Sequence, residues 1–386
     1  MRTSRLILIL AFASWALPPG AADQDPAEDA GTAAVRAALE EIYMGCRRGG
    51  AKVTDVQAFA RIQEIDGYLE KVHAIIEKVT TPSRQKVGAV YLLVGLKKKE
   101  SVYPLLLVLA DTAEPTYVRG LVARSLPEFG DPRGVIPLLD ILRADEPELW
   151  SDAGWALGGF AGDERALRGA RELLVHPTPG VRAAAVEGLE RLAPEDLTRT
   201  LLDAYRRERE PEPRIALTYA LGRLGAREAA DGMVADLESK DVAVLMAVIE
   251  SLGAIGPAAR EKALGRLQAI YGTETRAVLV GMAAGAMARI APDSVEVARA
   301  LVGRVGDPDR QLDLSSKIAL IQMKTKEVVD LLVEELGREE ATEERRNGLA
   351  EVLHRLTKND LGTDAAAWSR WWNERRGDFE FPAEEE

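Results

Sequence analysis

Cysteine and histidine are nearly absent from the 386-residue sequence. Cys46 is the only cysteine, so no disulfide can form within the chain. The three histidines, His73, His176 and His354, are dispersed, and no two stand at the spacing of metal ligands on a helix. The sequence therefore predicts neither a structural metal site nor a bound cofactor. Cys46 is expected to be a small buried or half-exposed apolar residue, with pairing to another chain as the alternative.

Aromatic residues and clustered positive charge are also scarce. Aromatics make up 5% of the chain, against 47% hydrophobic and 29% charged residues, so most of the apolar content is Ala, Leu and Val. This composition is typical of helices packed through small side chains and argues against an all-β protein. The formal net charge is -12, and basic residues gather only in short groups such as 97–99 and 345–346. Nucleic acid is therefore not an expected partner.

Motifs of known catalytic sites are missing as well. The chain has no nucleophile elbow, phosphate-binding loop, HExxH, CxxC or glycine-rich dinucleotide fingerprint. Paired carboxylates are frequent, but a chain with 62 acidic residues contains many accidental pairs. General acid–base catalysis also needs a cleft and a shifted pKa. We therefore predict a protein without catalytic activity.

The first 22 residues have the pattern of a secretory signal peptide. Arg2 and Arg5 precede the apolar run 6–13, and a Pro-Pro-Gly breaker is followed by the small residues Ala21 and Ala22. We expect cleavage after Ala22 and export to the periplasm or the extracellular space. The apolar run is short for a membrane-spanning helix, so no stable membrane insertion is expected after cleavage. An uncleaved N-terminal anchor is the alternative.

One phrase recurs along the chain at a steady period. Clear copies occupy 118–130, 181–192 and 213–225. The strongest apolar position of each copy lies 31 to 35 residues after the previous one, at Leu93, Leu126, Leu157, Leu189, Leu221, Leu252, Met287, Leu320 and Leu353. Such a period indicates stacked supersecondary units.

Each unit reads as a helical hairpin. In the copy at 118–130, apolar residues at positions 0, 4, 8 and 11 fall on one face of a helix, and Gly, Asp and Pro follow it. A second apolar helix then begins, as at 135–142. A hairpin of this kind cannot bury its apolar face alone, so neighbouring copies must pack together.

The repeated phrase resembles HEAT repeats, especially the short HEAT-like repeats of phycobilisome lyases. The resemblance covers roughly residues 80–357 and implies an all-α fold, an α-solenoid in which helical hairpins stack as a superhelix. The basic residue that the family carries after the leading apolar position is matched by Arg119, Arg182 and Arg214, and approximately by Lys86 and Arg346. Trp150, Leu245, Val280 and Asp313 depart from the pattern at the same position.

The remaining segments predict helical caps at both ends of the solenoid. Residues 23–31 are acidic and are expected to form a flexible leader, and 32–79 to form N-terminal capping helices at 33–46 and 55–79. Residues 358–386 form a Trp-rich cap and an acidic tail, and they are similar to the ending of bacterial secreted HEAT-repeat proteins of unknown function. Trp368, Trp371 and Trp372 share one side of a short helix, which favours a lid on the last repeat over a glycan or partner site.

Positions 2, 6 and 9 of the repeated helix point away from its core stripe, and in HEAT arrays this side lines the concave surface. At position 6 of successive copies, aromatic residues alternate with polar ones, and we expect them to form a ridge that binds a chain-like partner. The residues of this ridge are Tyr91, Arg124, Trp155, Glu187, Tyr219 and Glu250. The alternative is that these rings only cover neighbouring helices.

A second candidate lies further along the chain. Residues 278–288 are nearly uncharged on every face of a helix, and Gly281 and Gly285 are expected to permit close approach of another backbone. With the predicted neighbours they form an apolar hollow that consists of Met246, Gly281, Gly285, Leu314, Ile318 and Ile321. Either a partner fills this hollow, or the tail covers it with Phe379 and Phe381.

The leading functional hypothesis is an exported scaffold without catalytic activity that binds a protein or peptide on the concave face of its repeats. The repeat subtype also suggests a lyase-like or chaperone-like accessory protein that handles a cofactor or chromophore. A carbohydrate-binding module that uses the aromatic positions is the third hypothesis.

Overall fold

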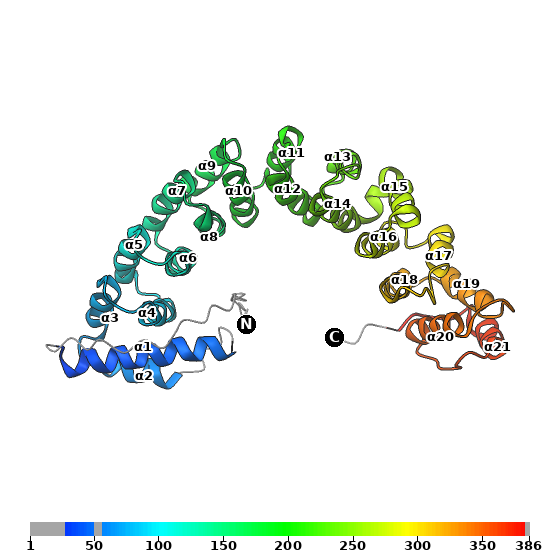
Figure 1. Ribbon diagram of the computed structural model, residues 1–386, viewed down its shortest axis with the longest axis horizontal. Helices are drawn as coiled ribbons and strands as arrows, with labels where there is room; N and C mark the ends of the chain where they lie inside the picture. The colour runs from blue at the N-terminus through cyan, green and yellow to red at the C-terminus, as the bar shows by residue number, and fades with distance from the viewer. Residues whose placement is uncertain (1–27, 50–55, 383–386) are drawn as a thin grey trace. The chain divides into compact units, whose positions relative to one another are not determined.

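A computed structural model describes residues 28–49 and 56–382 of the chain, and every regular element in these ranges is helical (Figure 1). The chain divides after Glu195 into two compact units. The predicted signal peptide, most of the predicted leader and the last four residues lie outside the described residues. The all-α solenoid expected from the repeats is confirmed in each unit.

The first unit has two layers of helices (Figure 1). The first helices of its hairpins are α3 (Tyr68–Glu77), α5 (Val102–Ala110), α7 (Val135–Arg143) and α9 (Glu164–Leu173). The second helices are α4 (Ser83–Leu96), α6 (Thr116–Ser125), α8 (Pro147–Leu157) and α10 (Pro179–Leu192). Each second helix packs on the next, and α1 (Ala30–Gly49) continues this layer on α4, with α2 (Val56–Gln63) against α1.

The second unit has the same two layers. Its first helices are α11 (Leu197–Arg207), α13 (Ala230–Asp236), α15 (Arg260–Thr273), α17 (Val295–Val302), α19 (Lys326–Leu336) and the closing α21 (Ala365–Arg375). Its second helices, packed in series, are α12 (Pro211–Arg223), α14 (Val242–Ile255), α16 (Ala277–Ile290), α18 (Arg310–Met323) and α20 (Glu343–Thr357).

Three predicted boundaries were wrong. The single helix expected at 55–79 is two, α2 and α3, because Gly67 adopts a left-handed conformation with φ of 63° before α3 begins. The helix of the copy at 118–130 ends at Ser125 and continues as a 3-10 turn, Leu126–Phe129, because Pro127 has no N–H for a helical hydrogen bond. In addition, α1 begins at Ala30, inside the predicted leader.

Glycines allow the closest contacts between second helices. A Cβ atom at Gly154 of α8 would lie 2.4 Å from the carbonyl oxygen of Ala184 on α10. A Cβ atom at Gly222 of α12 would lie 2.6 Å from the Cβ of Ser251 on α14. Both separations are shorter than an ordinary contact, so these helices touch through backbone and small side chains.

The stretch Val242–Thr273 is long and apolar enough, by length and composition, to cross a membrane. However, 61% of its apolar window is buried in the packing of the second unit. The backbone also leaves helical geometry at Gly256, with φ of 68°, where α14 ends and the 3-10 turn Gly256–Ala259 leads into α15. These features are those of core helices.

Candidate functional site

The basic residue of the repeated phrase binds the end of the helix before it. Arg119 Nε donates to the Leu109 carbonyl at 2.8 Å, and Arg182 Nη1 donates to the His176 carbonyl at 2.8 Å. Trp150, which departs from the family pattern, donates from its indole nitrogen to the Ala144 carbonyl at 3.0 Å. These side chains satisfy carbonyl groups at the preceding helix end, so they close each hairpin and have a structural role.

Arg214 extends this role to the next repeat. Its Nη1 donates to the carbonyls of Tyr205 and Glu208 at 2.6 and 2.9 Å, while Nε and Nη2 bind both carboxylate oxygens of Asp236 on α13 at 2.7 and 2.9 Å. Tyr205 donates its hydroxyl to Asp236 at 2.6 Å, and the Arg214 guanidinium lies over its ring, 3.9 Å from the centroid. Burial raises the pKa of Tyr205, so it remains a donor at neutral pH.

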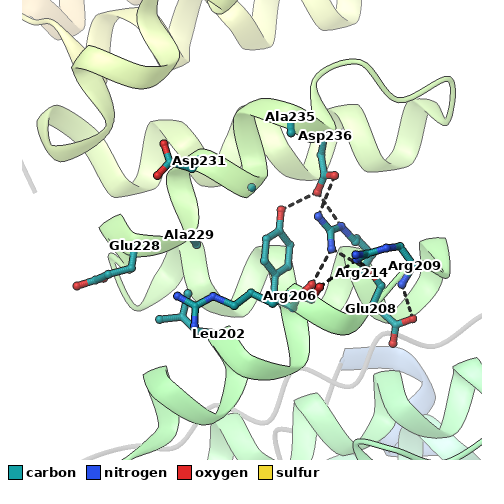
Figure 2. A pocket seen from close by; sticks show the side chains of 12 residues that line it. Leu202, Arg206, Glu208, Arg209, Arg214, Glu228, Ala229, Asp231, Ala235 and Asp236 are labelled. Atoms are coloured by element: carbon teal, nitrogen blue, oxygen red, sulfur yellow. Dashed lines mark hydrogen bonds and ion pairs between the residues drawn. The ribbon is translucent and has the colours of Figure 1, made fainter.

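These residues border a pocket of about 530 Å³ between α11 and α13 (Figure 2). Its charged side chains pair with other groups of the chain: Arg214 with Asp236, Asp231 with Lys262 at 2.6 Å, and Arg206 with Asp203 at 3.3 Å. Within the described ranges, no group of three or more His, Cys, Asp or Glu side chains could hold a metal ion.

The ridge of the first unit is half-buried. The hydroxyl of Tyr91 is fully covered and has no hydrogen-bond partner among the residues that the structure describes, and burial raises its pKa. Trp155 contacts two guanidinium groups, that of Arg191 at 3.5 Å and that of Arg124 at 5.1 Å from its ring. Arg191 also donates to the Trp155 carbonyl at 2.9 Å. Any ligand that stacks on this indole must therefore compete with the arginines.

Glu187 lies beside these arginines. Burial raises the pKa of its carboxyl, and the positive charges of Arg124 and Arg191 oppose that shift. Ser151 donates a long hydrogen bond to it at 3.4 Å, and Arg124 forms an ion pair with Asp152. The ridge of the first unit is therefore a charged cluster around one indole.

In the second unit the ridge continues with Tyr219 on α12, which is half-buried, and Glu250 on α14, which is exposed. Burial raises the pKa of the Tyr219 hydroxyl, with Glu250 as a further cause. Glu250 has no ion-pair partner in the described part of the chain. The binding of a partner by the ridge residues stays a prediction.

The apolar hollow lies on three successive second helices, α14, α16 and α18. Leu314 is 49% exposed and Ile318 46% exposed on α18, and Val278 at the start of α16 is 46% exposed. Met246, Gly281, Gly285 and Ile321 are half-buried. Most other apolar residues of α16 are buried: Leu279, Val280, Ala283, Ala284, Ala286, Met287, Ala288 and Ile290. The role of the apolar hollow in binding also stays a prediction.

The two glycines of the hollow differ. A Cβ atom at Gly281 would lie 3.1 Å from the Cβ of Ser315 on α18, so the expected close approach occurs there. At Gly285 no backbone of the described chain comes near, and the nearest atom to a Cβ would be Nη1 of Arg289, at 3.6 Å. The Arg289 guanidinium therefore lies between Gly285 of α16 and Gly253 of α14, where a Cβ atom would be 2.5 Å from its Nη2.

The described tail does not cover the hollow. Phe379 packs on Trp371 and Trp372 with ring centroids 5.8 and 5.2 Å apart, and Phe381 packs on Phe379 at 5.2 Å. Trp372 also donates to Asp330 of α19 at 2.7 Å. The tryptophans thus close the last repeat on the side of α19, as the lid interpretation predicted.

Sequence reasoning missed Arg191 and Arg289. Both occupy position 10 of their copies, near the end of a second helix, and Arg223 stands at the same position in its copy. A basic residue repeated at a helix C-terminus favours the helix dipole, and this signal could have drawn attention to them. Arg289 has no ion-pair partner among the residues that the structure describes.

The sequence profile of HEAT repeats matches residues 137–214 and 198–288. Residues 137–288 therefore contain HEAT repeats, and the helical hairpins of each unit stack as an α-solenoid. The matched segment lies inside the range 80–357 over which the repeated phrase predicted such repeats. No curated protein matches the sequence.

Several solved structures are similar. An engineered protein from a structural genomics consortium shares 18% identity over 89% of this chain and 95% of that chain, with a TM-score of 0.40. The complex of CpcE and CpcF of phycocyanin lyase, from a Nostoc species, shares 18% identity over 74% of this chain and 92% of that chain, with a TM-score of 0.29. Kap121p shares 12% identity over 88% of this chain and 46% of that chain, with a TM-score of 0.43.

Proposed function

We propose that the protein is an exported scaffold without catalytic activity that binds a protein or peptide partner on the face of its second helices. The observation that carries this proposal is the apolar hollow, where Val278, Leu314 and Ile318 are each 46% to 49% exposed on neighbouring helices. Soluble proteins rarely expose large apolar side chains together unless a partner covers them. The first 22 residues support export, because they have the pattern of a cleaved signal peptide.

The binding experiment compares two isoleucines of equal exposure. Ile318 is 46% exposed in the hollow, and Ile136 is 45% exposed on α7, in the layer of first helices of the first unit. The tagged mature chain and its Ile318→Asp and Ile136→Asp variants are each used to capture proteins from a cell-envelope extract. A partner of the hollow should be retained by Ile136→Asp and lost by Ile318→Asp, because a buried charge without a counter-ion costs several kcal/mol. Equal capture by both variants would overturn the assignment of the hollow.

Export has a separate test. The N-terminal peptide of the protein isolated from its own cells should begin at Asp23, if cleavage follows Ala22. A chain that retains its first residues and stays in the membrane fraction would show an uncleaved anchor.

A further inference from the structure

We propose that the pocket between α11 and α13 binds a small organic carboxylate with a single negative charge, and that Arg209 receives the carboxylate. The pocket lies between two first helices of the second unit, whereas the docking surface proposed above lies on second helices. This inference therefore goes beyond the proposed function and does not depend on it. The volume of about 530 Å³ is in the range of pockets that hold small molecules.

Arg209 lines this pocket with a guanidinium that has a free hydrogen-bonding edge. Its Nη1 donates to the carbonyls of Arg206 and Glu208 at 3.1 and 2.7 Å, which uses both hydrogens of this nitrogen. Within the described part of the chain the guanidinium has no ion-pair partner, and the residue is exposed. The edge formed by Nε and Nη2 is therefore available, and such an edge can bind both oxygens of a carboxylate through two parallel hydrogen bonds.

The acidic side chains of the lining already have a cation or backbone donors. Asp236 binds Nε and Nη2 of Arg214 with its two oxygens and also accepts the hydroxyl of Tyr205. The Glu208 carboxylate accepts the backbone N–H groups of residues 209 and 210, at 2.9 Å each. The other two ion pairs are Asp231 with Lys262 at 2.6 Å and Glu228 with Arg227 at 3.5 Å. The charged group that lacks an opposite charge is therefore the guanidinium of Arg209, and an anion supplies it.

A second guanidinium lies beside that of Arg209. Arg214 Nη1 donates to the same Glu208 carbonyl at 2.9 Å, so both guanidiniums contact one oxygen atom (Figure 2). Their positive charges repel each other, and the ion pair with Asp236 compensates only the charge of Arg214. A carboxylate on the free edge of Arg209 compensates the second charge. This match favours a carboxylate over a phosphate monoester, whose charge is about -1.5 to -2 at pH 7.

The remaining lining residues are small or apolar. Leu202 and Tyr205 of α11 are buried, as is Ala229 just before α13. On the side of α13 the pocket is lined by Gly232 and Ala235. A Cβ atom at Gly232 would lie 2.8 Å from Cε1 of Tyr205, so this ring occupies the space beside the glycine. The lining thus offers apolar contacts to the body of a ligand whose carboxylate binds Arg209.

The probes are 3-phenylpropanoate, hexanoate and octanoate, each compared with its primary amide, which has a similar shape without the charge. Their binding to the full chain is measured by titration calorimetry and by ligand-detected NMR. Arg209→Met removes the guanidinium, and its control is Arg207→Met, which removes an exposed arginine outside the lining. Ala235→Leu fills the pocket, and its control is Ala269→Leu, which changes an exposed alanine of α15 in the same layer. The helical spectrum and Tm of each variant are first compared with those of the parent.

The acids should bind about tenfold more tightly than their amides. Arg209→Met should abolish this difference and leave the affinity of the amides unchanged. Arg209→Lys should abolish most of it, because an ammonium group cannot form the two parallel hydrogen bonds of a guanidinium edge. Ala235→Leu should weaken acids and amides alike by about tenfold, because it fills the space of the ligand body. Both control variants should bind the probes like the parent.

Three results would overturn the inference: no binding by any of the acids, equal affinity of acids and amides for the parent, or a preference for acids that persists in Arg209→Met. Unchanged binding in a folded Ala235→Leu variant would place the carboxylate outside the pocket and overturn it as well.

Two further probes test the class of ligand. Inorganic phosphate that competes as well as the acids would contradict the charge match. N-acetyl-alanyl-leucine that binds about tenfold more tightly than octanoate would show a site for the C-terminus of a peptide in place of a small molecule. The capture experiment with Ile318→Asp tests the other layer of helices, so its failure and the failure of this inference are distinguishable.

Discussion

Replacing Gly222 by alanine should destabilise the second unit, although the same change stabilises most helices. The added Cβ would lie 2.6 Å from the Cβ and 2.8 Å from the Cα of Ser251, so α12 and α14 must move apart. Overpacking of this kind costs about 1–3 kcal/mol, and alanine returns less than about 1 kcal/mol near a helix end. The net loss is about 1–2 kcal/mol, or a fall in Tm of about 3–6 °C for a unit of this size.

The assay is thermal and urea unfolding followed by circular dichroism at 222 nm, with two companion variants. Gly265→Ala, in the same unit but with nothing within 4 Å of its Cβ position, should gain about 0.5–1 kcal/mol. The double variant Gly222→Ala with Ser251→Gly moves the Cβ atom across the interface, and a double-mutant cycle should give a favourable coupling of about 1 kcal/mol. Unfolding of Gly222→Ala at or above the parent Tm would refute the close contact between α12 and α14.

Four other outcomes follow from the contacts described above. Arg214→Met should cost about 3 kcal/mol in unfolding experiments, because it leaves the half-buried carboxylate of Asp236 without its cation. A chain that ends at Gly362 lacks the tryptophan lid and should unfold at lower temperature and aggregate in light scattering. Burial raises the pKa of the Glu187 carboxyl in the folded state, so ionisation of this group destabilises the fold once the pH exceeds the ordinary pKa of Glu. Glu187→Gln should therefore raise Tm at pH 7. The difference in Tm between this variant and the parent should vanish below about pH 4. Trp155→Ala should weaken binding of the captured partner about 30-fold if the indole is an anchor, and unchanged affinity in a folded variant would remove it from the site.

The sequence predicted the hairpins because their apolar positions repeat with the period of a helix and their ends carry Gly, Pro and Asp. It could not predict how far two helices stand apart. Gly281 and Gly285 look alike in the sequence, yet one lies against Ser315 of α18 and the other against the end of the Arg289 side chain. That difference depends on the side chain that α18 presents, which no pattern within α16 contains.

The sequence also could not predict the partners of the charged side chains. The repeated arginine was recognised as a family feature, but its partners are carbonyl groups of the preceding turn and, for Arg119 and Arg214, a carboxylate of the following repeat. Trp150 shows that a different residue type makes an equivalent bond from the same position. Periodicity locates such a position on the helix, whereas the identity of its partner depends on how the turn before it folds back.

The Arg214 contacts also have a mechanical consequence. One guanidinium joins the end of α11 to α13 while its own backbone belongs to α12, so it links helices of two successive hairpins. In a solenoid each repeat contacts only its neighbours, so these bonds belong to the interface between two successive hairpins. Peeling α11 away from the stack first requires rupture of the bonds to the Tyr205 and Glu208 carbonyls, and peeling α13 away first requires rupture of the bonds to Asp236. Arg214 therefore opposes detachment of both α11 and α13 from the stack.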